Sequence, residues 1–284
     1  MPPSGVTNQR PAGKPGALFY NFDLKTVEFY DGNNWRQVNN TSRRGLGVIH
    51  LGYDGTDRTY VHSVDINSQG NSVRFGDLTE AKDFGAACNS NVRGIYGGGH
   101  TSEYLTAIDS VIIQSTGQAN KFGDLSQARL GLGAGSSPTR AVFGGGSNNV
   151  DNLSLIDFIE IETGGTAVKF GELSVGRHYV SGISNSTRAL FAGGVTPTTV
   201  NTIDFITIAT TGNATDFGDL TTSKRVSAGT SSPTRAVWFG GLAPSGINVI
   251  EYVQIATTGG AVDFGDTVET VYEGGACSTG HGGL

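Results

Sequence analysis

The chain has 284 residues, of which 37% are hydrophobic and 44 are glycine, and its formal net charge is −6. It contains no run of about 18 apolar residues, so the sequence predicts no membrane insertion, and no Lys/Arg cluster that would neutralise nucleic-acid phosphates, so it predicts no nucleic-acid partner. A glycine share about twice the usual 7% indicates short strands and tight turns, in one large all-β domain or two smaller ones.

Residues 1–45 differ in composition from the rest. After a Pro-rich lead, residues 15–38 (PGALFYNFDLKTVEFYDGNNWRQV) alternate as in successive hairpins, with FDLK and DGNN as the turns. The lead has no apolar segment of a secretory signal, so export by that route is not expected. A hairpin region this small cannot bury a core alone, and we expect it to pack on residues 46–284 or on another subunit.

From residue 46 onwards the chain is repetitive. A Phe-Gly-acid phrase recurs every 47 or 48 residues, and three further segments recur with it, exemplified by FGAAC (84–88), IYGGG (95–99) and IDSVII (108–113). We name the strands that these segments predict inner, second and third, and the strand of the phrase outer. The phrase begins at Phe75, Phe122, Phe170, Phe217 and Phe264. Four strands in a period of 40 to 50 residues are typical of a propeller blade, so residues 46–284 are predicted to form a five-bladed β-propeller of four-stranded blades.

The two ends of this region are complementary. The first repeat begins at its second strand, near Leu46, whereas residues 272–278 form an inner strand without a repeat of its own. Joining them would complete the first blade and leave no open sheet edge. The sequence therefore predicts a ring closed by the C-terminal strand.

The Phe-Gly-acid phrase is interpreted as scaffold. Its aromatic residue would fill the space between adjacent sheets, and its glycine would permit a bend or bulge. Its acid has a cation five residues later, and we expect structural ion pairs at the start of the inner strands rather than a ring of ligands, although such pairs would add little stability where they are exposed. These expected pairs are Asp77–Lys82, Asp124–Arg129, Glu172–Arg177 and Asp219–Lys224, whereas the closing repeat has Val271 instead of a cation.

Taken together, these features resemble kelch repeats: an apolar strand ending in Gly-Gly, an alternating strand, an aromatic near the outer strand and a cation before the next inner strand. The resemblance covers residues 46–284, with Phe where Trp is usual and without the usual Tyr after the alternating strand. Kelch-like proteins share an architecture rather than an activity, so the resemblance implies the propeller and no particular function.

The loops differ between the two ends of the predicted blades. Turns from inner to second strand, such as SSPTR at 136–140 and 231–235, are nearly identical, whereas the loops from second to third strand differ in every repeat. Variable loops on a rigid scaffold are where binding usually resides, although a solvated loop uses the same residue types. The candidates, whose aromatic, amide and acidic groups would suit a carbohydrate, are Tyr53, Asp54, Arg58, His100, Glu103, Tyr104, Asn148, Asn149, His178 and Tyr179.

Signs of catalysis are weak. The histidines show no metal-binding spacing, and there is no nucleophile elbow or phosphate-binding loop. We therefore predict no catalytic residue, no metal and no cofactor. Cys88 and Cys277 hold equivalent positions on neighbouring inner strands, too far apart for a disulfide, and are predicted to be buried free thiols.

The N-terminal segment resembles one found in bacteriophage virion proteins, especially tail-fibre and head-fibre proteins, in which PG-x-φ-x-YN (φ apolar) precedes EFYDG-x-x-W. The matching residues are Pro15, Gly16, Tyr20, Asn21, Glu28, Phe29, Tyr30, Asp31, Gly32 and Trp35. The resemblance implies a virion protein assembled in the host cytoplasm and attached to other virion proteins through Tyr20, Phe29, Tyr30 and Trp35.

Three hypotheses of function follow. In the first, one propeller face of a phage structural protein binds a host surface glycan or a neighbouring virion protein. The second is a free lectin, although equivalent pockets would require repeated loops, and the third is a glycan-active or oxidative kelch-like enzyme. Whether the chain forms a homo-oligomer is left open, because the sequence contains no heptad repeat or collagen-like stalk that would require one.

Overall fold

A computed structural model describes residues 3–23, 26–37, 46–50, 55–66 and 70–273. The chain divides into two compact units, residues 1–44 and 45–284. The described residues form β-strands and one 3-10 turn, η1 (Thr7–Gln9), with no α-helix among them, which confirms the all-β prediction. None of these residues belongs to a helix long and apolar enough to cross a membrane.

The smaller unit is a four-stranded sheet of β1 (Ser4–Gly5), β2 (Leu18–Asn21), β3 (Thr26–Tyr30) and β4 (Trp35–Gln37). The two predicted hairpins are confirmed, since β2, β3 and β4 pair antiparallel. Asp31 Oδ1 closes the second turn by accepting from the backbone amides of Asn33 and Asn34. The parallel pairing of β1 with β2 was not predicted.

This unit has a partly polar centre. Glu28 is 1% exposed and accepts two hydrogen bonds from Arg10, of 2.8 and 2.6 Å, and one of 3.0 Å from Asn21 Nδ2. The hydrogen bonds from the Arg10 guanidinium lower the pKa of Glu28. A buried carboxylate requires such partners, and the Pro-rich lead supplies one of them in Arg10.

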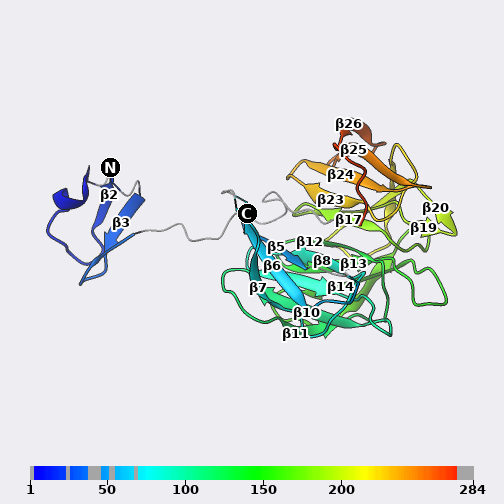
Figure 1. Cartoon of the computed structure of the whole chain (residues 1–284), viewed down its shortest axis with the longest axis horizontal. Coiled ribbons are helices and arrows are strands. Elements are labelled where there is room, and N and C mark those ends of the chain that lie inside the picture. The colour runs from blue at the N-terminus through cyan, green and yellow to red at the C-terminus, as the bar shows by residue number, and fades with distance from the viewer. Residues whose placement is uncertain (1–2, 24–25, 38–45, 51–54, 67–69, 274–284) are drawn as a thin grey trace. The chain divides into compact units, whose positions relative to one another are not determined.

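Each repeat of the larger unit forms one antiparallel sheet (Figure 1). The first sheet contains β5 (Leu46–His50), β6 (Tyr60–Asp65) and β7 (Val73–Asp77); the second β8 (Ala86–Asn89), β9 (Arg93–Gly97), β10 (Ala107–Ile112) and β11 (Asn120–Asp124); the third β12 (Gly133–Ser136), β13 (Arg140–Gly144), β14 (Leu155–Glu160) and β16 (Val168–Glu172); the fourth β17 (Ser181–Ser184), β18 (Arg188–Ala192), β21 (Thr202–Thr207) and β22 (Thr215–Asp219); and the fifth β23 (Ala228–Ser231), β24 (Arg235–Leu242), β25 (Gly246–Gln254) and β26 (Val262–Asp266). Short β15 (Gly165–Thr166) pairs with β11, and β19 (Val195–Thr196) pairs with β20 (Thr198–Thr199). Of the predicted closing strand, residues 274–278 lie outside the described residues.

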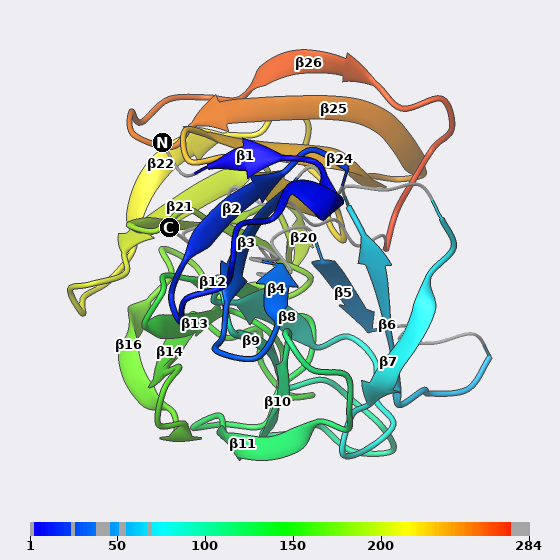
Figure 2. The same cartoon turned by 90° about the vertical axis from the view of Figure 1, so that its left-hand side faces the viewer.

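The inner strands β8, β12, β17 and β23 lie next to one another in this order, while the outer strands follow one another along the edge of the unit (Figure 2). Ser136 Oγ donates to the carbonyl of Asn89, Ser184 Oγ to that of Ser136, and Ser231 Oγ to that of Ser184. A Cβ on Gly182 would lie 2.3 Å from the Ala134 backbone. This crowding explains the small residues of the inner strands.

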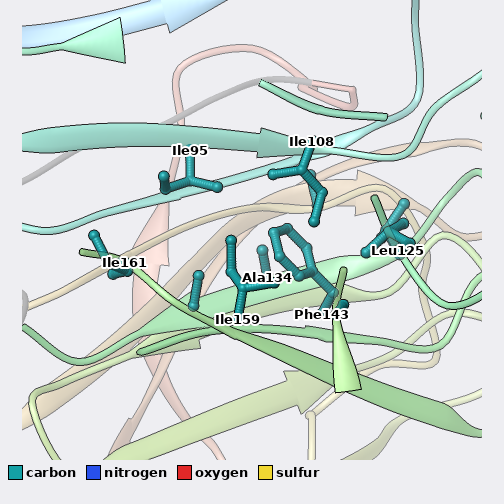
Figure 3. Close-up of a cluster of buried hydrophobic side chains, with 11 residues drawn as sticks. Ile95, Ile108, Leu125, Ala134, Phe143, Ile159 and Ile161 are labelled. Atoms are coloured by element: carbon teal, nitrogen blue, oxygen red, sulfur yellow. The ribbon is translucent and has the colours of Figure 1, made fainter. Parts of the chain in front are cut away.

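Apolar side chains fill the space between successive sheets. Between the second and third sheets, Ile95, Ile108 and Leu125 face Phe143 and Ile159 (Figure 3). Burial of each such side chain contributes about 1.5–3 kcal/mol. Gly97 ends β9 where a Cβ would stand 2.7 Å from the Phe143 ring, so the glycine at the end of a second strand makes room for the aromatic residue of the next sheet.

The Phe-Gly-acid phrase forms a bulge in every sheet. In the second sheet, Ile108 pairs with Gly123 and Asp109 with Lys121, so Phe122 is the extra residue. A Cβ on Gly123 would lie 1.8 Å from the carbonyl oxygen of Gly165 in β15, the strand of the next repeat that pairs with β11, which explains the glycine.

The expected burial of the phrase aromatics holds for Phe75, Phe170 and Phe217, whose carbonyls also accept hydrogen bonds from a turn glycine of the next sheet. Phe122 is partly buried. The expectation is wrong for Phe264, which is 55% exposed. Among the described residues, no turn glycine lies against Gly265, the residue after Phe264, so this copy lacks the cover that the other copies have.

The predicted partner of the repeated cation is wrong. Each cation pairs with an acid on the third strand of the following sheet, and all eight side chains are fully buried, not exposed. The pairs are Lys82–Asp109 (3.0 Å), Arg129–Asp157 (3.1 Å), Arg177–Asp204 (2.9 Å) and Lys224–Glu251 (2.5 Å). In three copies the acid of the phrase instead pairs with a surface cation three residues earlier: Arg74–Asp77, Lys121–Asp124 and Lys169–Glu172. In the fourth copy Asp216 stands at that position before Asp219. The chain crosses to the next sheet between the two positions, which separates residues only five apart in sequence.

Candidate ligand-binding site

Two residues after each of the four cations, and after Val271 in the closing repeat, the backbone turns into the left-handed region. The five residues there, which we call the rim residues, are Phe84 (φ +46°), Gly131 (+65°), Tyr179 (+55°), Val226 (+48°) and Glu273 (+58°). Only glycine adopts this conformation without steric cost, and a β-branched residue is an outlier. Four of the five rim residues therefore carry a strained backbone.

Backbone hydrogen bonds join the rim residues in chain order. The Gly131 amide donates to the Phe84 carbonyl (2.8 Å), the Val226 amide to the Tyr179 carbonyl (3.3 Å) and the Glu273 amide to the Val226 carbonyl (3.0 Å). Between Gly131 and Tyr179 the bond comes from the next residue, since the Val180 amide donates to the Gly131 carbonyl (3.2 Å). The rim residues thus form a continuous row at one end of the inner strands.

Two aromatic rings meet within this row. The Phe84 and Tyr179 ring centroids are 5.4 Å apart at an interplanar angle of 61°, although two repeats separate them. The residue between them is Gly131, where a Cβ would stand 2.9 Å from the Tyr179 amide nitrogen and 3.1 Å from its ring. The missing side chain of Gly131 therefore allows the contact.

Polar groups surround the Tyr179 ring. The Arg225 guanidinium carbon lies 5.3 Å from the ring centroid, and the His178 ring centroid lies 4.5 Å away. Burial raises the pKa of Tyr179, so its hydroxyl is protonated at neutral pH. Arg225 and Tyr179 can therefore both donate hydrogen bonds here.

His178 is neutral at pH 7, because burial and the nearby Arg225 charge lower its pKa. Its Nδ1 lies 2.7 Å from Asn152 Oδ1. Because the amide oxygen only accepts, we assign the proton to Nδ1, which makes Nε2 an acceptor.

Two carboxylates complete the surroundings. Burial, and then the charge of Asp57, raise the pKa of Asp83, whose side chain is 13% exposed and lies 3.7 Å from His100 Nδ1. Glu273 is exposed and lies close enough to affect the pKa values of both Asp83 and Tyr179. The charged groups around the two rings thus have no net positive charge.

The structure brings some predicted residues together. The rings of His100 and Tyr104 are 5.4 Å apart, and the Tyr104 hydroxyl donates to Asn149 Oδ1 at 3.3 Å, which links loops of the second and third sheets. Tyr104 also lies close enough to affect the pKa of Tyr179. His100, Tyr104, Asn149, His178 and Tyr179 therefore belong to one end of the unit.

Other predicted residues have local roles. Asn148 Oδ1 accepts from the amides of Val150 and Asp151 and stabilises its own turn. Glu103 is exposed; its carbonyl accepts a hydrogen bond from the Thr101 amide, and its amide donates to Thr101 Oγ1. The Arg58 carbonyl lies 2.8 Å from His50 Nε2. Tyr53 and Asp54 lie outside the described residues.

Sequence reasoning missed Asp83, Phe84, Asn152, Arg225 and Glu273. Phe84 and Glu273 hold the repeat position of Tyr179, and Asp83 and Arg225 hold that of His178. Counting from the cation of each repeat would have found Asp83, Phe84 and Arg225, and counting from Val271 would have found Glu273. Their side chains differ in every copy, so no motif marks the position.

The smaller unit separates the four predicted attachment residues. The rings of Tyr30 and Trp35 contact each other on the face that contains buried Phe19 and Glu28, with centroids 5.5 Å apart at an interplanar angle of 59°. On the other face, Leu18 and Phe29 are cross-strand partners. Among the described residues of this unit, the large hydrophobic side chains that are exposed are Leu18 (48%), Phe22 (53%) and Phe29 (37%). The ring of Tyr20 contacts that of Phe22, with centroids 5.7 Å apart.

The only described cysteine, Cys88, is a free thiol, and burial raises its pKa to about 12. Cys277 lies outside the described residues. Among the described residues no group of three or more His, Cys, Asp or Glu side chains is arranged to hold a metal ion.

No protein-family model matches the chain, and a search of curated proteins finds no match either. Fold and site define an all-β protein of two units, the larger built from repeated antiparallel sheets with an aromatic and polar rim.

Proposed function

We propose that the chain is a structural binding protein of a bacteriophage particle. Residues 46–284 form a closed five-bladed β-propeller, residues 1–45 attach it to another virion protein, and the rim end binds a host surface glycan. The difference between the two ends of the sheets carries this proposal. At one end, equivalent turns repeat the same hydrogen bond, from Arg140 N to Ser137 Oγ, from Arg188 N to Asn185 Oδ1 and from Arg235 N to Ser232 Oγ. At the other end, the rim residues differ in every repeat, as a recognition surface requires.

Closure is supported by periodicity. Cys88 pairs with Ile95 across β8 and β9, and Gly135 with Val142 across β12 and β13. Cys277 holds the repeat position of Cys88, and Val48 on β5 holds that of Ile95, so closure would pair Cys277 with Val48. Closure would also bring the first repeat next to exposed Phe264, as successive repeats cover the equivalent phenylalanines.

A disulfide tests closure directly. In a Cys88→Ser background, Val48→Cys is expected to form an intramolecular disulfide with Cys277, since cross-strand neighbours meet the Cα distance limit of about 7 Å. Ile49→Cys, one residue along and on the opposite face of β5, is the control. Closure is refuted if the Val48→Cys chain stays reduced under mild oxidation or links only to a second chain.

Attachment through the smaller unit is supported by its exposed apolar face and by the resemblance of residues 15–35 to phage fibre proteins. Leu18 and Phe29 place apolar area side by side on one face of an antiparallel sheet. Exposed apolar residues gathered on one face are typical of interaction sites.

Adsorption separates the two roles. The intact protein, a Leu18→Ser/Phe29→Ser variant and a Tyr104→Ala/Asn149→Ala variant are applied to host cells and to phage particles that lack the protein. The first variant is expected to bind cells but not particles, and the second particles but not cells. If the intact protein binds particles and never cells, the rim contacts another virion protein; if it binds cells and never particles, it is a free lectin. Either result refutes the proposal.

A further inference from the structure

We propose that Phe84 and Tyr179 form a stacking platform for one uncharged sugar residue, with Arg225 and His178 as its hydrogen-bonding partners. This inference rests on the proposed function, because it names the ligand class and the contacts of the same rim.

Backbone strain is the first argument. Phe84 and Tyr179 adopt φ values of +46° and +55° at a repeat position where Gly131 shows that glycine fits. Val226 and Glu273 share this strain, so it marks the whole rim, and strained residues of this kind are concentrated at functional sites. The Phe84 ring does not serve the core, because this residue is 37% exposed.

The geometry of the rings is the second argument. Their edge-to-face contact across Gly131 holds each ring in one orientation. The Arg225 guanidinium lies over the Tyr179 ring, 5.3 Å from its centroid, and the His178 ring centroid lies 4.5 Å away at an interplanar angle of 50°. Sugars present an apolar C–H face and hydroxyls that both donate and accept, and this site offers aromatic area, the guanidinium donor of Arg225 and the acceptor Nε2 of His178.

The charges favour an uncharged sugar. The Arg225 cation lies in the same cluster as the carboxyl groups of Asp83 and Glu273. Repulsion from these groups offsets the attraction of an anionic sugar to Arg225. Carboxylates accept hydrogen bonds from sugar hydroxyls, so they add to the binding of a neutral ring.

The test uses the intact chain and saturation-transfer NMR with methyl glycosides of uncharged hexoses and N-acetylhexosamines, beside glucuronic and sialic acids. At least one uncharged sugar is expected to bind, and Tyr179→Gly and Phe84→Gly are each expected to weaken it at least tenfold. Val226→Gly is the matched control, since it relieves strain at the same repeat position and should change affinity less than twofold. In all three variants the Tm should stay unchanged or rise by up to about 4 °C, because glycine relieves the strained φ.

Three results would overturn the inference: no uncharged sugar of the panel binds, acidic sugars bind better, or Tyr179→Gly and Phe84→Gly retain affinity within twofold. If a glycine variant loses its cooperative melting transition, Arg225→Met, which keeps an apolar stem, replaces it with an expected fivefold loss. Cell adsorption distinguishes the two proposals. Adsorption that persists in Tyr179→Gly refutes this site alone, whereas sugar binding without adsorption refutes the phage receptor role alone.

Discussion

Substitution of Asp204 by Asn should be strongly destabilising. Asp204 and Arg177 are both fully buried and 2.9 Å apart. The carboxylate also accepts from the Ser174 amide and hydroxyl, at 3.1 and 2.9 Å, while Arg177 Nη2 donates to the Phe191 carbonyl. Asp204→Asn leaves the guanidinium buried without its counterion, which costs about 3–5 kcal/mol. For a unit of this size that lowers Tm by about 6–20 °C.

The assay is urea unfolding followed by tryptophan fluorescence. The chain has two tryptophans, and Trp238 is fully buried in β24. A Trp35→Phe background therefore makes the signal specific to the larger unit. Linear extrapolation then gives the free energy of unfolding for each variant.

The matched control is the exposed pair of the same repeat. Lys169 and Glu172 are 2.6 Å apart but 59% and 46% exposed, so Glu172→Gln should cost less than about 1 kcal/mol. Arg177→Met in the Asp204→Asn background should recover part of the loss, with a coupling energy of about 2 kcal/mol. A cost for Asp204→Asn no larger than that for Glu172→Gln would refute the reasoning from burial.

Three further predictions follow from individual residues. Gly171→Ala should lower the free energy of unfolding by at least about 2 kcal/mol, because the new Cβ would lie 2.0 Å from the Gly212 carbonyl oxygen. Gly70→Ala is the control: a Cβ there meets nothing within 4 Å, so its free energy of unfolding in the same urea assay should stay within about 1 kcal/mol of wild type. Equal costs for the two variants would contradict this reasoning. In a Cys277→Ser variant at pH 8, half-buried Cys88 should react with iodoacetamide at least about 100-fold more slowly in the folded chain than in urea, because burial raises its pKa to about 12. Similar rates would show that the folded chain does not raise the pKa of this thiol. Hydrogen bonds from Arg74 and Thr59 lower the pKa of Asp77 to about 2, so NMR of its carboxyl carbon should give a midpoint near pH 2 that Arg74→Gln raises. Because this folded-state pKa is depressed, Asp77 stabilises the fold above pH about 4, and that contribution is lost as the pH falls towards 2. A titration midpoint near pH 4 in both the wild type and Arg74→Gln would exclude the ion pair.

The strands were predictable because their signals are local. Alternation placed a third strand at 108–113, and β10 spans Ala107–Ile112. DGNN placed a turn between β3 and β4, where Asp31 accepts the two turn amides. In both cases a few neighbouring residues determine the backbone conformation.

The ion pairs and the rim were not predictable in this way. Lys82 lies five residues from Asp77 in sequence, yet pairs with Asp109 on the next sheet, because the chain turns between them. Positive φ at Phe84 or Tyr179 has no sequence signal, since these residue types normally avoid it. Both features depend on contacts between sheets, and a single repeat does not contain them.

The buried ion pairs and the strained rim residues are structurally linked. Arg177 lies two residues before strained Tyr179, and its side chain forms an ion pair with Asp204. The backbone carbonyl of Arg177 accepts a hydrogen bond from the Gly146 amide of the preceding sheet. Strained conformations persist only where their surroundings over-determine them. Val271 lacks the cation, yet its carbonyl still accepts from the Gly241 amide before Glu273. The backbone bond, present with or without the cation, therefore sets the position of the rim, and the buried ion pair stiffens it beneath Tyr179.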